Sequence, residues 1–275
     1  MEFQHILFPV DFSKPCEQAV PPVLQMMKSL GARVTLLHAW QVPCAWSSGM
    51  DPRMLEGLID FKGLQNQQQA ALEQFRKVHF ASAGAEAVLR NGDPATQISE
   101  YARTAGLDLI MMPTHAYGCF RAALIGSVAA KVIHDALCAV WTSAHMEKLH
   151  SPPYPYRLIM CAVDDTEESI KTIRHAGLLA GDLECSMIIV HALADHAQSE
   201  SQVSSRLESC EALAQVSVPI YMEKGEIATV VPETARRYGA DLVVVGRGHA
   251  PEMLGSWRSH IYPIIRNSPC PVLTI

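Results

Sequence analysis

The sequence lacks the features by which nucleic-acid-binding and membrane proteins are usually recognised. Its 275 residues include 22 Lys and Arg against 28 Asp and Glu, which gives a formal net charge of -6. This balance offers no clustered positive charge to a phosphate backbone or to an anionic membrane surface. No apolar run approaches the ~20 residues of a transmembrane helix, and the first residues lack the basic and apolar segments of a secretion signal. We therefore expect a soluble, cytoplasmic protein that binds neither nucleic acid nor membranes.

Cysteine and histidine are present, but not in the spacings that bind metal. The eight cysteines form no Cys-x-x-Cys pair, and several, such as Cys138 and Cys161, lie inside apolar runs. The twelve histidines show none of the close spacings of a zinc site. We expect buried, reduced thiols and no metal site.

What the sequence does contain is one unit present in two copies. Residues 106–115 read GLDLIMMPTH and residues 239–248 read GADLVVVGRG, and a Cys-x-Val run follows each of them. Each copy opens with an apolar run that ends in Val-Asp, at residues 10–11 and 163–164. A repeat of this length predicts two similar domains, and the chain is long enough to bury two cores.

Short apolar runs alternate with helical stretches in both copies. In the first copy we expect strands at 5–10, 34–39, 86–90, 107–112 and 139–142, with helices near 14–30, 59–80, 94–105 and 126–136. In the second copy we expect strands near 157–163, 186–192, 217–222, 240–245 and 271–275, with helices near 166–181, 198–214, 227–238 and 259–267. The alternation is typical of an α/β fold, a parallel sheet with helices on both faces.

Prolines and glycines mark the boundaries of these units. Pro21 and Pro22 should kink the first helix, because proline removes a backbone donor and clashes with the preceding turn. Residues 41–58 have no counterpart in the second copy and are interpreted as an inserted loop or lid. We assign 1–145 to a first domain and 157–275 to a second. The linker between them, 146–156, should be stiff and extended because it is rich in proline.

These motifs resemble the universal stress proteins of UspA type, in the tandem form with two such domains in one chain. The resemblance is carried by residues 9–13 (PVDFS), 92–94 (GDP), 108–115 (DLIMMPTH) and 126–128 (GSV). It implies two Rossmann-like domains of the adenine nucleotide alpha hydrolase-like fold, each with a five-stranded parallel sheet of order 3-2-1-4-5. It also implies that the domains pair through their last strands, which would cover two sheet edges.

The resemblance further implies that ATP or a related adenine nucleotide, with or without Mg²⁺, binds to the first domain only. Many members bind ATP with the motif Gly-x2-Gly-x9-Gly-Ser/Thr after the fourth strand. The corresponding candidates here are Pro9, Val10, Asp11, Ala39, Met112, Thr114, His115, Gly118, Gly126, Ser127 and Val128. A Gly-Ser pair at a helix N-terminus offers phosphate unpaired N–H groups, a hydroxyl and the positive end of the helix dipole. Asp11, at the end of strand one, could accept a hydrogen bond from adenine or ribose.

The first copy departs from the family motif in its glycine loop. Ala116 and Cys119 stand where the motif has its first two glycines, and Gly118 is displaced by one residue. A methyl group at position 116 restricts positive φ and close approach of phosphate. Triphosphate binding is therefore expected to be weakened or reshaped.

The second copy departs further. Residues 258–259 (Arg-Ser) stand where the first copy has 126–127 (Gly-Ser). Glu252 would bring negative charge toward a phosphate, which Arg247 and Arg258 could offset. We expect this domain to have a degenerate motif and to serve as a structural or regulatory partner.

Several candidates also have a purely structural interpretation. Asp11 and Asp164 could cap the helix or loop that follows them. His115 could bond to backbone groups, and residues 126–127 could be only a helix cap. Residues 92–94 favour a turn and helix start, with proline at the first helical position.

The residues form no constellation for covalent or acid-base catalysis, so slow ATP hydrolysis is the most we expect. Asp164 and Asp165, with two glutamates nearby, could hold Mg²⁺, but a solvated helix start is the commoner explanation. The alternative function is a nucleotide-free module that binds a protein or a small ligand. A protein partner or a homodimer is compatible with either function.

Overall fold

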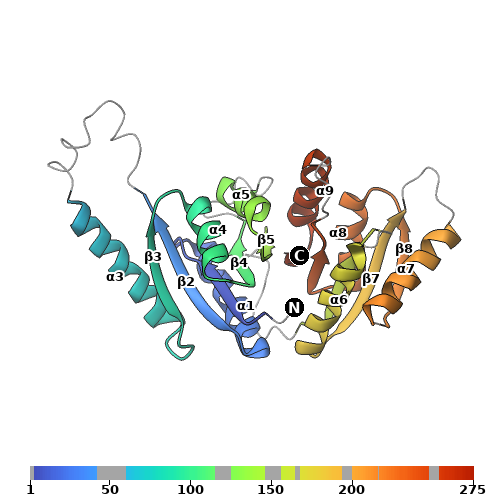
Figure 1. Ribbon diagram of the computed structural model, residues 1–275, viewed down its shortest axis with the longest axis horizontal. Helices are drawn as coiled ribbons and strands as arrows, with labels where there is room; N and C mark the ends of the chain where they lie inside the picture. The colour runs from blue at the N-terminus through green and yellow to red at the C-terminus, as the bar shows by residue number, and fades with distance from the viewer. Residues whose placement is uncertain are drawn as a thin grey trace.

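The computed structural model describes residues 3–41, 60–114, 125–145, 156–164, 168–193, 200–215, 217–247 and 254–275. Ten strands in these ranges form one sheet, in the order β3-β2-β1-β4-β5-β10-β9-β6-β7-β8 (Figure 1). The predicted insertion lies outside the described residues apart from Gln41, and so does the predicted linker apart from Tyr156.

In the described residues, each half supplies five strands and four helices in alternation. The first half contains β1 (His5–Pro9), α1 (Lys14–Leu30), β2 (Arg33–Trp40), α3 (Phe61–His79), β3 (Glu86–Asn91), α4 (Pro94–Thr104), β4 (Leu109–Pro113), α5 (Ser127–Asp135) and β5 (Ala139–Ser143). The second half contains β6 (Leu158–Ala162), α6 (Glu168–Asp182), β7 (Ser186–Leu193), α7 (Glu200–Ala214), β8 (Ile220–Lys224), α8 (Ile227–Tyr238), β9 (Leu242–Val245), α9 (Leu254–Asn267) and β10 (Val272–Thr274).

The predicted fold class and strand order are confirmed. Within each half all strand pairs are parallel, and the order is 3-2-1-4-5 in both. The two halves join through β5 and β10, which run antiparallel with Val272 opposite Thr142. Two edges that would otherwise expose unpaired backbone groups therefore satisfy each other.

Helices cover both faces of the sheet. Buried residues of α1, α3, α6 and α7 pack in one apolar cluster, and those of α4, α5, α8 and α9 pack in another. Helices α5 and α9 flank the junction of the halves (Figure 1), where the Tyr262 hydroxyl donates to the Ala130 carbonyl at 3.0 Å.

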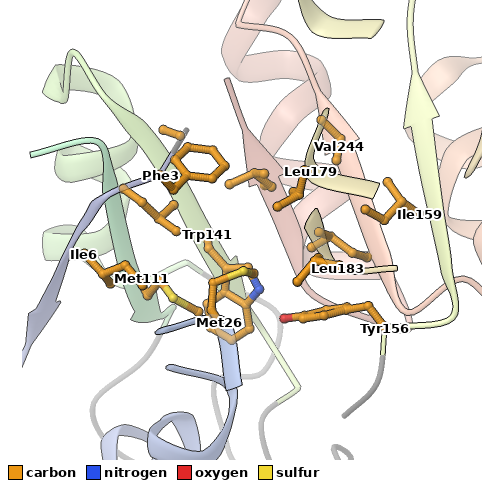
Figure 2. Close-up of a cluster of buried hydrophobic side chains, with 14 of the residues drawn as sticks. Phe3, Ile6, Met26, Met111, Trp141, Tyr156, Ile159, Leu179, Leu183 and Val244 are labelled. Atoms are coloured by element: carbon orange, nitrogen blue, oxygen red, sulfur yellow. The ribbon is translucent and has the colours of Figure 1, made fainter. Parts of the chain in front are cut away.

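The first cluster is continuous across the junction. Trp141 of β5 is fully buried in it, beside Met26 and Met111 of the first half. Figure 2 shows Tyr156 and Leu183 on the opposite side of the indole. The two halves therefore share apolar core as well as backbone hydrogen bonds.

Two elements begin three or more residues from their expected start, and the other boundaries differ by two residues or fewer. Helix α9 begins at Leu254 rather than near residue 259, and β8 is shifted toward residue 224. The nearest proline before α9 is Pro251, so no proline prevents a start at 254. Helix α1 is one continuous helix that contains both Pro21 and Pro22.

The repeated Gly-x-Asp sequence has the same structural role in both halves. The Asp108 carboxylate accepts hydrogen bonds from the backbone N–H groups of residues 4 and 5, at 2.9 and 3.0 Å. The Asp241 carboxylate accepts from those of residues 157 and 158, at 2.8 and 3.1 Å. Each aspartate thus fixes the first strand of its half beside the fourth.

Candidate functional site

The carboxyl ends of β1, β2 and β4 meet at one edge of the first half. β1 pairs in parallel with both β2 and β4, so these strands end side by side. Pro9, Val10 and Met112 are buried there, and Ala39 is half-buried. The Val10 N–H extends the ladder past β1 by donating to the Leu37 carbonyl at 2.8 Å. Four predicted site residues are therefore brought together at this edge.

The start of α5 is held at the end of β4. The Gly126 N–H donates to the Thr114 carbonyl at 2.9 Å. Thr114 in turn donates from its N–H and its hydroxyl to the Ser143 carbonyl, at 3.1 and 3.2 Å. Thr114 is buried, so its side chain serves to position the loop and β5 rather than to face solvent.

The first turn of α5 has the features of an anion-binding helix start. Gly126 is the N-cap, and no side chain from the described residues caps the helix. Ser127 is exposed at the first helical position, while Val128 is half-buried and packs against the second apolar cluster. The first backbone N–H groups of a helix have no partner within it, and they carry the positive end of its dipole.

Asp11 is exposed between β1 and α1 and has a local structural contact. Its Oδ1 accepts from the Ser13 N–H at 2.9 Å, and Ser13 caps α1 by accepting from the Cys16 N–H at 3.3 Å. The Ser13 N–H bonds Oδ1 alone, so this contact does not use Oδ2. The capping and the ligand-binding interpretations of Asp11 are thus compatible.

Phe12 and His38 form an aromatic pair at the same edge, which was not predicted from the sequence. Phe12 has a φ of 59°, a left-handed conformation that is rare for a bulky side chain. Its ring lies 4.6 Å from the imidazole of His38 and 6.0 Å from the ring of Phe75. No local sequence signal predicts positive φ at a phenylalanine.

The repeat in the sequence would have predicted that His38 has a structural role at this edge. Its Nδ1 donates to the Val10 carbonyl at 2.7 Å, and its Nε2 lies 3.0 Å from Oε1 of Gln68. In the second half, Nδ1 of His191 makes the same contact with the Val163 carbonyl at 3.0 Å. The sequence contains His-Ala at both places, which is the signal that identifies these equivalent histidines.

In the second half, Asp164 also has a local contact. Its Oδ1 accepts from the Ser169 hydroxyl at 2.7 Å, and its carbonyl accepts from the same hydroxyl at 3.0 Å. The aspartate therefore contacts the first turn of α6 through a side-chain hydroxyl.

Arg247, which was expected to offset the charge of Glu252, bonds to the first half. Its guanidinium donates to the carbonyls of Ala136 and Cys138 in the first half, the latter at 2.6 Å. Burial lowers its pKa from the ordinary value. The arginine therefore binds carbonyl oxygens at the end of α5 and is a contact between the halves.

Residues 92–94 form the predicted turn and helix start. Asp93 is the N-cap of α4, with Pro94 at the first helical position. Its Oδ2 accepts from the Thr96 hydroxyl and N–H at 2.6 and 3.0 Å, and Lys131 Nζ lies 3.1 Å away. These contacts, the Thr96 hydroxyl above all, lower the pKa of Asp93 to about 2.

Some predicted features lie outside the described residues. They are His115, Ala116, Gly118, Cys119, Asp165 and Glu252, together with the side chain of Arg258. Among the described residues, no group of three His, Cys, Asp or Glu could hold a metal ion, and no helix is long and apolar enough to cross a membrane.

The described cysteines are free thiols; four of them are buried, as expected, but Cys138 and Cys185 are half-buried. Burial is the main cause that raises the pKa of Cys16 and of Cys270 to about 12, and that of Cys138 to about 11. Thiols with such pKa values are poor nucleophiles at neutral pH.

Comparisons with known proteins agree with this architecture. A model of the universal stress protein family matches residues 2–143 and 195–275. A universal stress protein from Archaeoglobus fulgidus superposes with a TM-score of 0.73 at 18% identity, over 99% of this chain and 96% of that one. A functionally unknown protein from Pseudomonas aeruginosa superposes with a TM-score of 0.71 at 16% identity, over 99% and 92%. A comparison with curated proteins gave no match.

Proposed function

The chain belongs to the universal stress protein family, and we propose that it is a cytoplasmic protein whose first half binds ATP or a related adenine nucleotide. The ligand would lie at the carboxyl ends of β1, β2 and β4. Ligands of open parallel sheets bind at this edge, where the order of the strands reverses. In the first half the order reverses at β1, between β2 and β4.

One observation carries the proposal: the 2.9 Å hydrogen bond from the Gly126 N–H to the Thr114 carbonyl. It fixes the first turn of α5 at the end of β4. The exposed Ser127 and the first N–H groups of α5 would bind phosphate oxygens there. His115 and Gly118 remain part of the proposed phosphate loop.

The nucleoside would lie toward β1 and β2. Asp11 Oδ2 would accept from ribose or adenine, because the Ser13 N–H bonds Oδ1 alone. Val10, Ala39 and Met112 supply apolar surface beneath it. The proposed site therefore combines an anion-binding end with a less polar end.

The second half is proposed as the structural or regulatory partner. Arg247 follows β9, at the position equivalent to Thr114, and it binds carbonyls of the first half. Asp164 is engaged with Ser169. The Arg247 contact joins the two halves, and the Asp164 contact is local to α6, so both residues are engaged within the fold.

Substitution of Ser127 tests the phosphate end. We expect Ser127→Asp to weaken ATP binding by at least about tenfold, because a carboxylate would stand where phosphate binds. The same charge at a helix N-terminus favours the helix, so the variant should fold. Titration calorimetry with Mg²⁺-ATP measures the affinity, and Ser127→Ala is the matched control with a smaller expected effect. Equal affinity of the Asp variant and the native protein would refute the phosphate assignment.

The alternative is a nucleotide-free module that binds a protein or a small ligand. The engaged Thr114 hydroxyl and Asp11 Oδ1 favour it, because both groups already have partners within the fold. Absence of ATP binding by the native protein in the same titration would support this alternative. Any hydrolysis would be slow, and Mg²⁺-dependent phosphate release above that of Ser127→Asp would be its signature.

A further inference from the structure

Strand β3 lies at one end of the ten-stranded sheet (Figure 1). It pairs in parallel with β2 on one side, and no described strand pairs with it on the other. None of its residues is buried, whereas four residues of β2 are. An edge strand presents every second N–H and C=O group outward, where another strand can bind them.

The two charged residues of β3 lie on one face of the sheet. Glu86 and Arg90 are exposed and lie four positions apart, so their side chains share a face with Val88. Val88 packs against the second apolar cluster, and the Arg90 guanidinium lies 5.2 Å from the ring centroid of Tyr101 in α4. The α4 side of this edge therefore carries a negative charge before Val88 and a positive charge after it.

Two-fold symmetry restricts how this edge can pair with a second copy of itself. Antiparallel pairing needs an axis normal to the sheet, which keeps the α4 face of both copies on the same side. Residues opposite each other must then come from the same face. Only the register centred on Val88 places Glu86 opposite Arg90, and the symmetry makes this pair twice. A shift of one copy by two residues would instead place Val88 opposite a charge.

The same register is also favourable on the other face of the edge. There it places Ala87 of one copy opposite Leu89 of the other. Both residues are half-buried and pack against the first apolar cluster of their own chain. Opposite charges and apolar contacts directly across two strands both stabilise the pairing.

The edge at the other end of the sheet lacks this complementarity. β8 ends in Glu223 and Lys224, which lie on opposite faces because they are neighbours. No two-fold register can therefore place them opposite each other. Glu223 also accepts a hydrogen bond from Arg237 of its own chain at 2.6 Å. Of the two edges, only β3 is self-complementary in charge.

We propose that two copies of the chain pair through β3, antiparallel and centred on Val88, with Glu86 of each copy bound to Arg90 of the other. The pairing would join two ten-stranded sheets in the way that β5 and β10 join the two halves. Backbone hydrogen bonds supply the affinity of such an added strand, and the ion pairs set its register. None of the proposed nucleotide-binding residues lies in β3, so the proposed function does not depend on this pairing.

Charge reversal tests the pairing. Sedimentation velocity of the full chain should show a dimer that weakens as salt is added, because salt screens exposed ion pairs. Glu86→Arg and Arg90→Glu should each weaken the dimer by at least about tenfold, because like charges would then face each other at both ends of the paired strands. The double variant Glu86→Arg/Arg90→Glu makes the charges opposite again and should restore the dimer.

Lys171→Glu is the matched control for Arg90→Glu. It makes the same change of charge at an exposed position of α6, in the second half, and should leave the dimer unchanged. Far-UV circular dichroism checks that each variant keeps its fold. A native protein that remains monomeric would overturn the pairing, and the charges of β3 would then serve to protect a free edge. A dimer that survives both single reversals, or that the double variant does not restore, would overturn the contact of Glu86 with Arg90.

Discussion

At the N-terminus of α4, Asp93 accepts hydrogen bonds from Thr96 and Lys131 through one carboxylate oxygen. We expect Asp93→Ala to lower the free energy of unfolding by about 1 kcal/mol, as is typical for loss of an N-cap. Asp93→Asn should lose less, because its side-chain carbonyl can still accept from the N–H. Urea denaturation of the three proteins at pH 7 measures both differences.

The same carboxylate should make part of the stability depend on pH. Its pKa is about 2 in the folded protein against an ordinary 3.8, so its stabilisation is complete above pH 3.8 and is lost as pH falls toward about 2. The side chain is 53% exposed, so solvent screens the contribution of Lys131. The advantage of the native protein over Asp93→Asn should shrink across this window. An advantage that stays constant down to pH 2 would contradict the assignment.

Residues of the site differ in how well the sequence predicts them. Gly126 and Ser127 were predictable, because a Gly-Ser pair before a helical stretch is a local signal. The engagement of Thr114 with Ser143 was not, because it joins residues that are far apart in the chain. The same holds for Arg247, whose partners lie in the other half.

At the scale of the element, α6 contains a glycine whose replacement should stabilise it. Gly181 does not have positive φ, and a β-carbon there meets no atom within 4 Å. We expect Gly181→Ala to raise the free energy of unfolding by up to about 1 kcal/mol, because alanine has the higher helix propensity. Thermal unfolding followed by circular dichroism measures the gain. A lower melting temperature would show that this glycine has a structural role that the space around it does not reveal.

Element order was the most predictable part of the fold, because it rests on hydrophobic patterns that occur twice. Strands such as β4 and β9 are continuous apolar runs, as expected of strands that are buried on both faces. The start of α9 was not predicted, since alignment with α5 assumed equal helix lengths. Helix ends depend on the local chain, which has diverged between the copies.

At the scale of the whole molecule, Arg247 joins the halves through carbonyls at the end of α5. We expect Arg247→Met to lower the free energy of unfolding by about 1–3 kcal/mol, because two carbonyl oxygens lose their donor. Urea denaturation gives the value.

Arg236→Met is the matched control for that substitution. Arg236 is exposed and donates to the Asn267 carbonyl at 3.4 Å. Its loss should change stability by no more than about 0.5 kcal/mol. If both variants are equally stable, the buried contact between the halves contributes nothing measurable.

The junction between the halves supports the proposed structural role of the second half. The ten-stranded sheet and the core around Trp141 bind the second half to the first. Together with Arg247, they give the second half a structural role whether or not it binds a ligand. The domain boundary that we propose, at 146–156, leaves each set of five strands in one domain.

Native mass spectrometry of the chain with Mg²⁺-ATP is the most direct test of the central claim. We predict one nucleotide per chain for the native protein, and its loss in Ser127→Asp. Two nucleotides per chain would contradict the assignment to the first half alone. No bound nucleotide at saturating ATP would contradict the nucleotide-binding function itself.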